Sequence, residues 1–477
     1  MTEGRGDHML FASAGFLFAF LPLFLLIFMV APKRAKRAVV LLGSILFYVL
    51  ANLHSPFSIL VLWAAVLFHY FAAMLLRRRH DLILLCLLIA VDLAAFFSLR
   101  LLCNQTLEHY YFIFPVGASI YLLSGISYLI DHYRDSALPT DNLVQTALYL
   151  TFFPVMLAGP LIRFRDFLKY TENFSFHMND FARGARLLTV GLAKCMGVAA
   201  VLTEAYDNIL QYSNLQVNIG IGLLSLAMMY LIVFFAFSGY SDMGVGICIM
   251  LGMPVRRDYR NPLTATSLMG YLRGFFASFY EYMKDYVLDP LAAMSFATPR
   301  LRRALGKTLL VLSLTLWFRV DFRFVLIALP LLIAVLLEEC TPLGGFLHRH
   351  WYGKALGWLM TLVVAALFWT MQKLGSYATF GEYLRNLLEV SGSYQSLYTY
   401  ATSIGSDFII VAAIALAILM PLSHTGNTIS DLMPARARSV ADSIISVILM
   451  GLLILTLVYF MPQYPQYAVD PYAYFVI

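Results

Sequence analysis

Apolar runs long enough to cross a membrane recur along this chain, and they constrain its fold more than any other feature. A helix needs about 20 apolar residues to cross the hydrocarbon layer. Runs that approach or exceed this length lie near 9–31, 55–76, 81–102, 217–237, 322–338, 355–372 and 440–461. Because 61% of the residues are hydrophobic and only 13% are charged, a water-soluble core could not hide this apolar surface. The sequence therefore predicts an all-α polytopic membrane protein.

Shorter apolar runs lie near 38–53, 111–130, 143–159, 186–203, 243–253, 307–318 and 407–421. Together with the long runs they predict a bundle of roughly eleven to fourteen helices, some of them short and re-entrant or interfacial. The polar interruptions near 160–185 and 254–306 mix charged and aromatic residues, which is typical of amphipathic helices at a membrane face. No interruption is long enough for a soluble domain, so we predict a single domain over 1–477.

Basic residues gather in short loops, which predicts the topology. The clusters at 33–37 and 77–80 follow apolar runs and should face the cytoplasm by the positive-inside rule. The N-terminus then starts outside, and we expect an even number of crossings. Because the basic residues form no surface stripe, we predict membrane lipid and no nucleic acid as a partner. The five scattered cysteines show no Cys-x-x-Cys spacing and are interpreted as buried thiols, with no metal site.

Ordered motifs between about 115 and 338 carry a family resemblance. They are Pro-Val-Gly-Ala-Ser-Ile-Tyr at 115–121 with Ser-Tyr-Leu-Ile-Asp-His-Tyr-Arg at 127–134, Ala-Gly-Pro-Leu-Ile-Arg-Phe-Arg-Asp-Phe at 158–167, Phe-Ser-Gly-Tyr-Ser-Asp-Met at 237–243, Tyr-Leu-Arg-Gly-Phe-Phe-Ala-Ser at 271–278 with Lys-Asp-Tyr-Val-Leu-Asp-Pro-Leu at 284–291, and Leu-Trp-Phe-Arg-Val at 316–320. Their order resembles the membrane-bound O-acyltransferase (MBOAT) family, in particular its bacterial alginate O-acetylation and teichoic-acid D-alanylation members. The resemblance implies an MBOAT-like bundle.

Two positions depart from the family pattern. Where the family carries histidines, this chain has Phe276 and Phe318, and the second of those histidines is taken as catalytic in relatives. Acyl transfer needs a base that removes the acceptor proton, and histidine suits this with a pKa of about 6.5. Phenylalanine has no titrating group, and loss of a general base typically lowers the rate about 10²–10⁴-fold. No histidine lies between 178 and 347, and the nearest upstream, His132 and His177, are expected in loops.

Carboxylates are the weak substitutes for the missing base. Asp321 lies three residues after Phe318, and Asp285 and Glu281 lie in the other matching segments, although ion pairs or structural hydrogen bonds explain these acids at least as well. The resemblance implies substrate-binding roles for Ser238, Tyr240, Asp242, Arg273, Ser278, Tyr286 and Trp317.

The acyl donor and the partners are also implied by the resemblance. We expect no bound cofactor, with acyl-coenzyme A or another acyl thioester as the donor. Its phosphates could contact the cytoplasmic arginines, although topology-setting loop charge explains these residues equally well: Arg163, Arg165, Arg256, Arg257, Arg300, Arg302 and Arg303. Relatives act with an extracytoplasmic acyltransferase partner on an envelope glycan.

The sequence thus leaves three hypotheses for a multi-pass protein of the bacterial inner (cytoplasmic) membrane. The first is a catalytically degenerate MBOAT-like protein of cell-envelope polysaccharide O-acylation, with a scaffold, donor-binding or partner role. The second is an active O-acyltransferase with a rearranged site. A transporter or flippase is a distant third, because the hydropathy pattern shows no inverted repeat.

Overall fold

The computed structural model describes residues 10–53, 55–104, 115–135, 138, 142–157, 159–172, 174–211, 219–260, 262–295, 298–318, 322–374, 377–388, 447–448 and 450–463. Within these ranges the regular structure is helical and no strand occurs, which confirms the predicted all-α class. Five helical segments are long and apolar enough to cross a membrane: Pro56–Arg79, Leu82–Leu102, Met178–Asp207, Gly222–Met250 and Trp351–Leu374. The predicted run near 407–421 lies outside the described residues.

The chain divides into two compact units that alternate along the sequence. The first unit comprises Met1–Leu188, Ser241–Asp258 and Ala277–Asp321. The second comprises Thr189–Tyr240, Tyr259–Phe276 and Phe322–Ile477. This division into units leaves the single domain over 1–477 a prediction.

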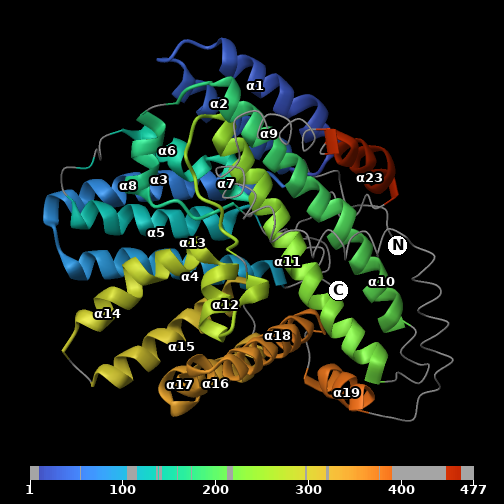
Figure 1. Ribbon diagram of the computed structural model, residues 1–477. Helices are drawn as coiled ribbons and strands as arrows, with labels where there is room; N and C mark the ends of the chain where they lie inside the picture. The colour runs from blue at the N-terminus through green and yellow to red at the C-terminus, as the bar shows by residue number, and fades with distance from the viewer. Residues whose placement is uncertain are drawn as a thin grey trace, which may run out of the picture. The chain divides into compact units, whose positions relative to one another are not determined.

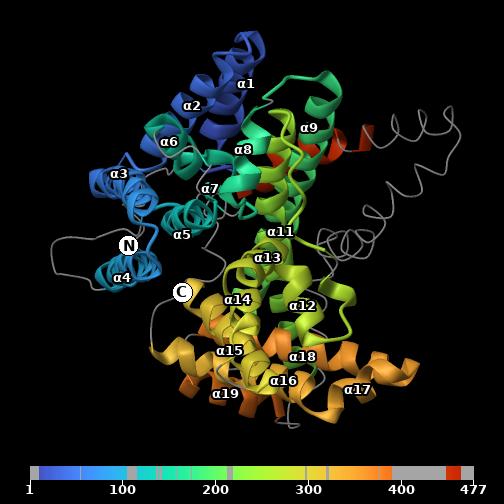
Figure 2. The same ribbon diagram turned by 90° about the vertical axis from the view of Figure 1, so that its left-hand side faces the viewer.

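The N-terminal two fifths of the chain supply most helices of the first unit. They are η1 (Gly15–Phe20), α1 (Leu21–Val30), α2 (Lys36–Ala51), α3 (Pro56–Arg79), α4 (Leu82–Asn104), α5 (Ala118–Arg134), α6 (Leu143–Thr151), α7 (Phe153–Met156) and α8 (Phe164–Glu172). Later segments add α13 (Ala277–Met283), η5 (Lys284–Leu288), α14 (Asp289–Ala293) and α15 (Pro299–Phe318). Helix α5 packs against both α3 and α4, and the three run side by side (Figures 1 and 2).

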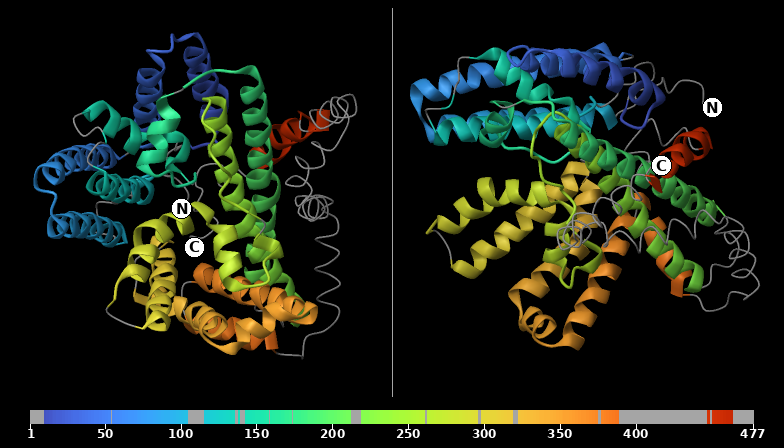
Figure 3. Two further views of the ribbon diagram at one scale, coloured as in Figure 1. Left: turned by 60° about the vertical axis from the view of Figure 1, so that its left-hand side comes forward. Right: turned by 45° about the horizontal axis from the view of Figure 1, so that its top comes forward.

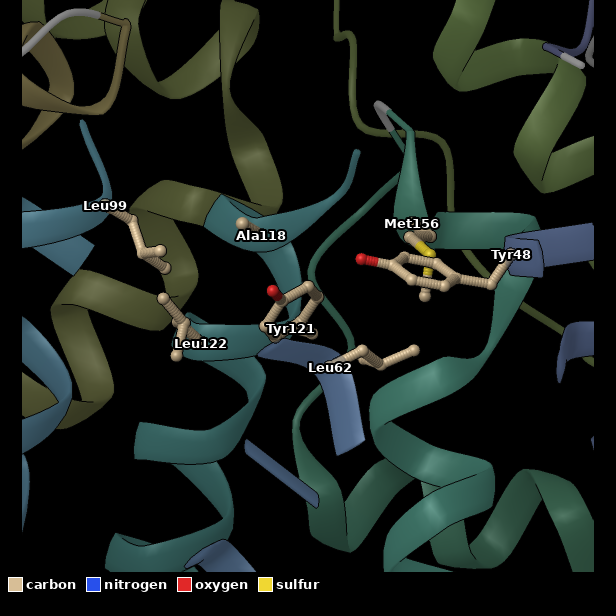
Figure 4. Packing of buried hydrophobic residues seen from close by; sticks show 7 residues of the cluster. All are labelled: Tyr48, Leu62, Leu99, Ala118, Tyr121, Leu122 and Met156. Carbon is tan, nitrogen blue, oxygen red and sulfur yellow. The ribbon is translucent and has the colours of Figure 1, made fainter. Parts of the chain in front are cut away.

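Buried tyrosines and aliphatic residues form the core where α5 begins. Figure 4 shows the cluster of Tyr48, Leu62, Leu99, Ala118, Tyr121, Leu122 and Met156. The Tyr48 hydroxyl donates to the carbonyl of Ser58 over 3.1 Å, so this core also closes the turn between α2 and α3. Gly117 precedes α5 with a φ of +74°, and a Cβ there would collide with Met156. Only glycine suits this position.

An ionisable pair is buried between two candidate membrane spans of the first unit. His69 of α3 places Nε2 2.8 Å from Asp92 Oδ2 of α4, and its Nδ1 lies 2.7 Å from the carbonyl of Ala65. Because a carbonyl only accepts, Nδ1 carries a proton, and one further proton lies between Nε2 and the carboxylate. The imidazole packs directly on Gly125 of α5, where a Cβ would overlap it. The pair therefore ties α3, α4 and α5 together.

The second unit is built from the middle and the C-terminal part of the chain. Its helices are η2 (Ala193–Ala199), α10 (Ala200–Gln211), η4 (Pro262–Thr264), α12 (Leu268–Phe275), α16 (Phe322–Cys340), α17 (Pro342–Arg349), α18 (Trp351–Leu374), α19 (Tyr377–Leu388), η6 (Thr456–Phe460) and α23 (Met461–Gln463). Helices α16 and α18 pack against each other, as Figure 3 shows in orange. Helices α9 (Met178–Leu192) and α11 (Ile219–Met250) each continue from one unit into the other.

Helix α11 corrects one expectation. The runs at 217–237 and 243–253 belong to one helix of 32 residues, and the motif at 237–243 lies inside it. The sequence divided it because Ser238, Ser241 and Asp242 are polar, yet all three are buried.

Glycines bring α11 against the helix that begins with α9. In the first unit, a Cβ on Gly246 would lie 2.7 Å from the carbonyl oxygen of Gly184. In the second unit, a Cβ on Gly239 would lie 2.7 Å from the carbonyl oxygen of Gly191. Real Cβ atoms do not approach that closely, so backbone meets backbone at both places. Close packing of small residues of this kind is common between membrane helices.

Candidate functional site

Phe276, where the resemblance led us to expect a family histidine, lies in a cluster of aromatic rings in the second unit. It follows the last residue of α12 and is half-buried. Its ring centroid lies 4.6 Å from that of Phe275, 5.9 Å from Phe237, and 6.4 Å from both Tyr259 and Trp369. These spacings are those of ordinary aromatic packing. The position thus contributes packing and offers no proton acceptor.

A hydrogen bond fixes one wall of this cluster. The Trp369 indole N–H of α18 donates to the Tyr271 hydroxyl of α12 over 2.8 Å, and both side chains are buried. Tyr271 also packs on Phe275, with centroids 5.3 Å apart. The tryptophan is held at both its polar and its apolar side, which orders the rings around Phe276.

Phe318 is the last residue of α15. The side chains of Phe318 and Trp317, like the whole of Asp321, lie outside the described part of the structure. The roles predicted for these three residues therefore remain predictions.

The motif at 237–243 presents buried hydroxyls without partners. In the second unit Ser238 Oγ, and in the first unit Ser241 Oγ, accept and donate no hydrogen bond among the described residues. Serines inside a helix usually bond a carbonyl one turn earlier, and an unpaired buried hydroxyl costs free energy. Such groups indicate a functional position or an ordered water. Of their predicted neighbours, Tyr240 is buried, and Asp242 lies 3.8 Å from the Arg257 guanidinium.

Ser278 joins two motifs in the first unit. The backbone N–H of Leu161, in the motif at 158–167, donates to Ser278 Oγ over 2.9 Å. The backbone N–H of Ser278 in turn donates to the carboxylate of Asp258, and that of Ala277 donates to the Asp258 carbonyl over 3.2 Å. Asp258 therefore caps the beginning of α13. The predicted substrate-binding hydroxyl of Ser278 serves as a backbone acceptor.

Tyr286 joins the same part of the first unit to α5. Its hydroxyl donates to Asp131 Oδ1 over 2.9 Å and lies 3.0 Å from Ser127 Oγ. The backbone N–H groups of Phe164 and Arg165 donate to Ser127 Oγ and Asp131 Oδ2, respectively, both over 3.2 Å. Three motifs that lie far apart in sequence thus share one buried polar network.

Charged side chains extend this network. The Arg163 guanidinium bonds the Asp285 carboxylate and also donates to Asp166 over 2.9 Å. Arg165 lies 3.7 Å from Asp131 and 3.8 Å from Asp285. Burial lowers the pKa of Arg163, but the carboxylates of Asp166 and Asp285 outweigh it and hold that pKa above its ordinary value. Asp285 is therefore placed as a counter-ion rather than as a free base.

The structure also places Arg273, Glu281 and the two upstream histidines. Arg273 of α12 is exposed, and Glu281 of α13 is half-buried. His132 was expected in a loop, but it lies in the last turn of α5, buried, with Nδ1 2.7 Å from the Tyr128 carbonyl. His177 does lie in the loop before α9. Among the described residues, no group of three or more metal-binding side chains occurs.

Comparison with protein families identifies the chain. Residues 46–371, more than half of its length, match the model described as MBOAT, membrane-bound O-acyltransferase family. The chain belongs to this family. The match extends beyond the family-like core predicted at about 115–338. With the spans described above, membership shows a multi-pass membrane protein.

Curated proteins similar to this MBOAT chain are between 22% and 28% identical to it over the matched residues. A probable alginate O-acetylase AlgI of Pseudomonas fluorescens is 28% identical over 310 residues, covering 64% of this chain and 61% of the relative. The corresponding protein of Pseudomonas aeruginosa is 27% identical over 340 residues, covering 67% and 64%. A peptidoglycan O-acetyltransferase of Helicobacter pylori is 22% identical over 431 residues, covering 80% of each. The chain thus spans about three fifths of the first of these relatives.

Sequence reasoning missed several members of the candidate site. Asp131, Ser127 and Asp258 organise the network, yet none was predicted as a site residue. Asp131 and Ser127 lie in a motif that carries the resemblance, so the motif was the available signal. Asp258 had no such signal, because its role depends on the N–H groups of a helix that begins 19 residues later.

Proposed function

We propose that this protein serves the O-acylation of a cell-envelope polysaccharide in the bacterial cytoplasmic membrane, as a catalytically degenerate MBOAT member. It keeps the helical scaffold and a donor-binding or partner-binding role, while the proton-transfer step is lost. The names of its relatives, which describe O-acetylation of alginate and peptidoglycan, support the polysaccharide context. A separate extracytoplasmic acyltransferase would then complete the transfer to the glycan.

The environment of Phe276 carries this proposal. Four aromatic rings surround the ring of Phe276, so none of the five side chains contains a group that titrates near neutral pH. General base catalysis needs a group with a suitable pKa within hydrogen-bond reach of the acceptor hydroxyl. The aromatic cluster meets neither condition, whereas it would suit an apolar acyl group.

The rearranged-site alternative depends on a carboxylate. Asp285 is held in an ion pair by Arg163 and lies 3.8 Å from Arg165, so its carboxylate already has partners within the fold. Glu281 is half-buried on α13 and Asp321 lies outside the described residues, so these two remain the acids for that alternative to use. Acyl transfer by the purified protein that required Glu281 or Asp321 would favour it.

The seven arginines considered for donor binding differ in whether their side chains already have partners within the fold. Arg163, Arg165 and Arg257 face carboxylates, and Arg302 donates to the carbonyls of Ala292 and Met294. Arg256 and Arg300 are exposed. We therefore propose Arg256 and Arg300 as the residues that contact the phosphates of an acyl-coenzyme A.

The decisive experiment measures transfer and donor binding on the same preparation. Purified protein in lipid vesicles is given radiolabelled acetyl-coenzyme A and either an alginate or a peptidoglycan acceptor, with an alginate O-acetylase AlgI as the active control. We expect donor binding without acetyl transfer to the protein or the glycan, and weaker binding in an Arg256→Ala/Arg300→Ala variant.

Two outcomes would contradict the proposal. Acetyl transfer by the purified chain at a rate close to that of the control would show that catalysis survives. Unchanged acetylation of every envelope polysaccharide after deletion of the gene would remove the polysaccharide context itself.

A further inference from the structure

A cluster of polar side chains lies where two membrane spans of the second unit end. Tyr206 and Asp207 come from α10, and Thr370, Gln372 and Lys373 come from the last turns of α18. Lys373, Gln372, Thr370 and Tyr206 are all buried, while Asp207 remains 39% exposed. Ionisable groups at such depth are rare in membrane helices and usually functional.

Much of the hydrogen-bonding capacity of this cluster is unused. The Tyr206 hydroxyl, Thr370 Oγ1 and Gln372 Nε2 complete no hydrogen bond of ordinary geometry with a described residue, although the two hydroxyls lie close together. Lys373 Nζ lies 3.6 Å from Asp207 Oδ1, which is longer than an N–H···O hydrogen bond. A separation of this kind leaves room for a bridging atom. The arrangement is therefore complete only when another polar group enters it.

The membrane face of the cluster follows from the positions of basic residues. Arg183 and Arg186 lie in the first half of the span that ends at Asp207. Arg349 ends α17 just before α18, and Lys354 lies in the first turn of α18. By the positive-inside rule these ends face the cytoplasm, so Asp207 and Lys373 lie toward the opposite face. Helix α11 gives the same orientation, because basic residues follow its C-terminal end.

The beginning of α11 reaches the same cluster. Tyr383 of α19 lies near Tyr206, and its hydroxyl is 2.6 Å from Ser225 Oγ in the first turns of α11. The basic pair Arg256 and Arg257 follows the other end of α11, so by the positive-inside rule that end faces the cytoplasm. Three spans thus place the cluster at the extracytoplasmic face.

The charges of the cluster decide what it can bind. Lys373 and Asp207 compensate each other, so a free anion would meet Asp207 and a free cation would meet Lys373. A hydroxyl both donates and accepts, and it can bridge an ammonium and a carboxylate while pairing with Tyr206, Thr370 and Gln372. We propose that this cluster binds sugar hydroxyls of an envelope glycan at the extracytoplasmic face. The inference rests on the proposed function for the class of ligand that reaches this face.

Direct binding tests the inference without an acyl-transfer assay. Full-length protein in a detergent without a sugar head group is titrated with N-acetylglucosamine hexasaccharide and, separately, with alginate hexasaccharide. The variants are Tyr206→Phe and Thr370→Val, which remove hydroxyls that complete no hydrogen bond of ordinary geometry with a described residue. We expect each to weaken binding of at least one probe about threefold to tenfold, with thermal stability unchanged. Lys354→Met, on the exposed part of α18, is the matched control and should bind normally.

The outcomes separate this site from the proposed function. Absence of binding by both hexasaccharides, or binding that Tyr206→Phe and Thr370→Val leave unchanged, would overturn the inference. If phosphatidylglycerol vesicles alone occupied the cluster, this result would also overturn the inference and assign its polar groups to lipid binding. The transfer and deletion experiments described above remain informative in each case, because they do not depend on this cluster.

Discussion

The hydroxyl of Tyr286 donates to the carboxylate of Asp131 over 2.9 Å, across 155 residues of sequence. The bond joins η5 to the last turn of α5 within the first unit. Ser127 adds a second contact to the same hydroxyl and accepts the backbone N–H of Phe164. Through these contacts Tyr286, which the resemblance associates with substrate, also holds the framework in place.

Removing the Tyr286 hydroxyl should destabilise the protein. Tyr286→Phe leaves the buried Asp131 carboxylate without its side-chain donor, and hydrogen bonds to charged groups contribute about 1.5–3 kcal/mol. We expect a loss of that size in the free energy of unfolding, measured by denaturant titration in detergent. Tyr352→Phe, on the exposed beginning of α18, should change stability little. Equal effects of the two substitutions would argue against the network.

Stability should also depend on pH through Asp131. Burial raises the pKa of this carboxyl, and this effect exceeds the opposing effects of the Tyr286 hydrogen bond and of Arg165. The folded state then binds its proton more tightly than the unfolded state does, so stability falls as the pH rises from the ordinary value of about 3.9 through the raised pKa. Asp131→Asn should flatten this part of the pH profile. A profile that is identical in the variant would contradict the assignment.

Backbone contact between helices predicts a difference between two glycines. Gly246→Ala forces a methyl group against the Gly184 carbonyl, and overpacking of this kind costs about 1–3 kcal/mol. Gly345→Ala, in α17, meets nothing within 4 Å and should keep or raise stability by up to about 1 kcal/mol, because alanine favours helix. Thermal unfolding of both variants measures the difference. Similar shifts would show that α11 does not depend on this approach.

The pair of His69 and Asp92 should show strong coupling. His69→Gln or Asp92→Asn alone leaves a buried polar group without its partner, and breaking a buried pair costs about 3–5 kcal/mol. The double variant should lose clearly less than the sum of the two, which a double-mutant cycle measures. Additive losses would mean that the two side chains act independently despite their 2.8 Å contact.

A histidine placed at position 276 should not by itself produce acetyl transfer. Phe276→His places an imidazole among aromatic rings, where a polar group without a partner costs about 1–3 kcal/mol. We expect lower thermal stability and no acetyl transfer in the vesicle assay. Phe346→His, at an exposed position of α17, should be tolerated. Transfer regained by Phe276→His alone would show that the rest of the active site is intact.

Hydropathy predicted the membrane spans well where polar residues lie outside the helix. The runs at 55–76, 81–102 and 355–372 correspond to the spans Pro56–Arg79, Leu82–Leu102 and Trp351–Leu374. It failed at α11, because Ser238 and Asp242 lower the local hydropathy although the helix continues through them. Burial by neighbouring helices, which a local average does not register, makes those polar residues tolerable.

The candidate site was predictable only in part. The motifs identified Ser278, Asp285 and Tyr286, but their partners Leu161, Arg163 and Asp131 lie more than 100 residues away. No local spacing encodes pairings over such distances, and the Leu161 contact uses a backbone N–H that its side chain does not reveal. The contacts of these residues lie within the fold, and their substrate-binding roles stay predictions.

The rings around Phe276 have a consequence for any attempt to place a polar group at this position. Trp369 is fixed to Tyr271 by a hydrogen bond and fills space beside Phe275, so the neighbouring rings pack around a benzyl group. A polar side chain at position 276 would therefore have to be accompanied by substitutions among these rings that supply it with hydrogen-bonding partners.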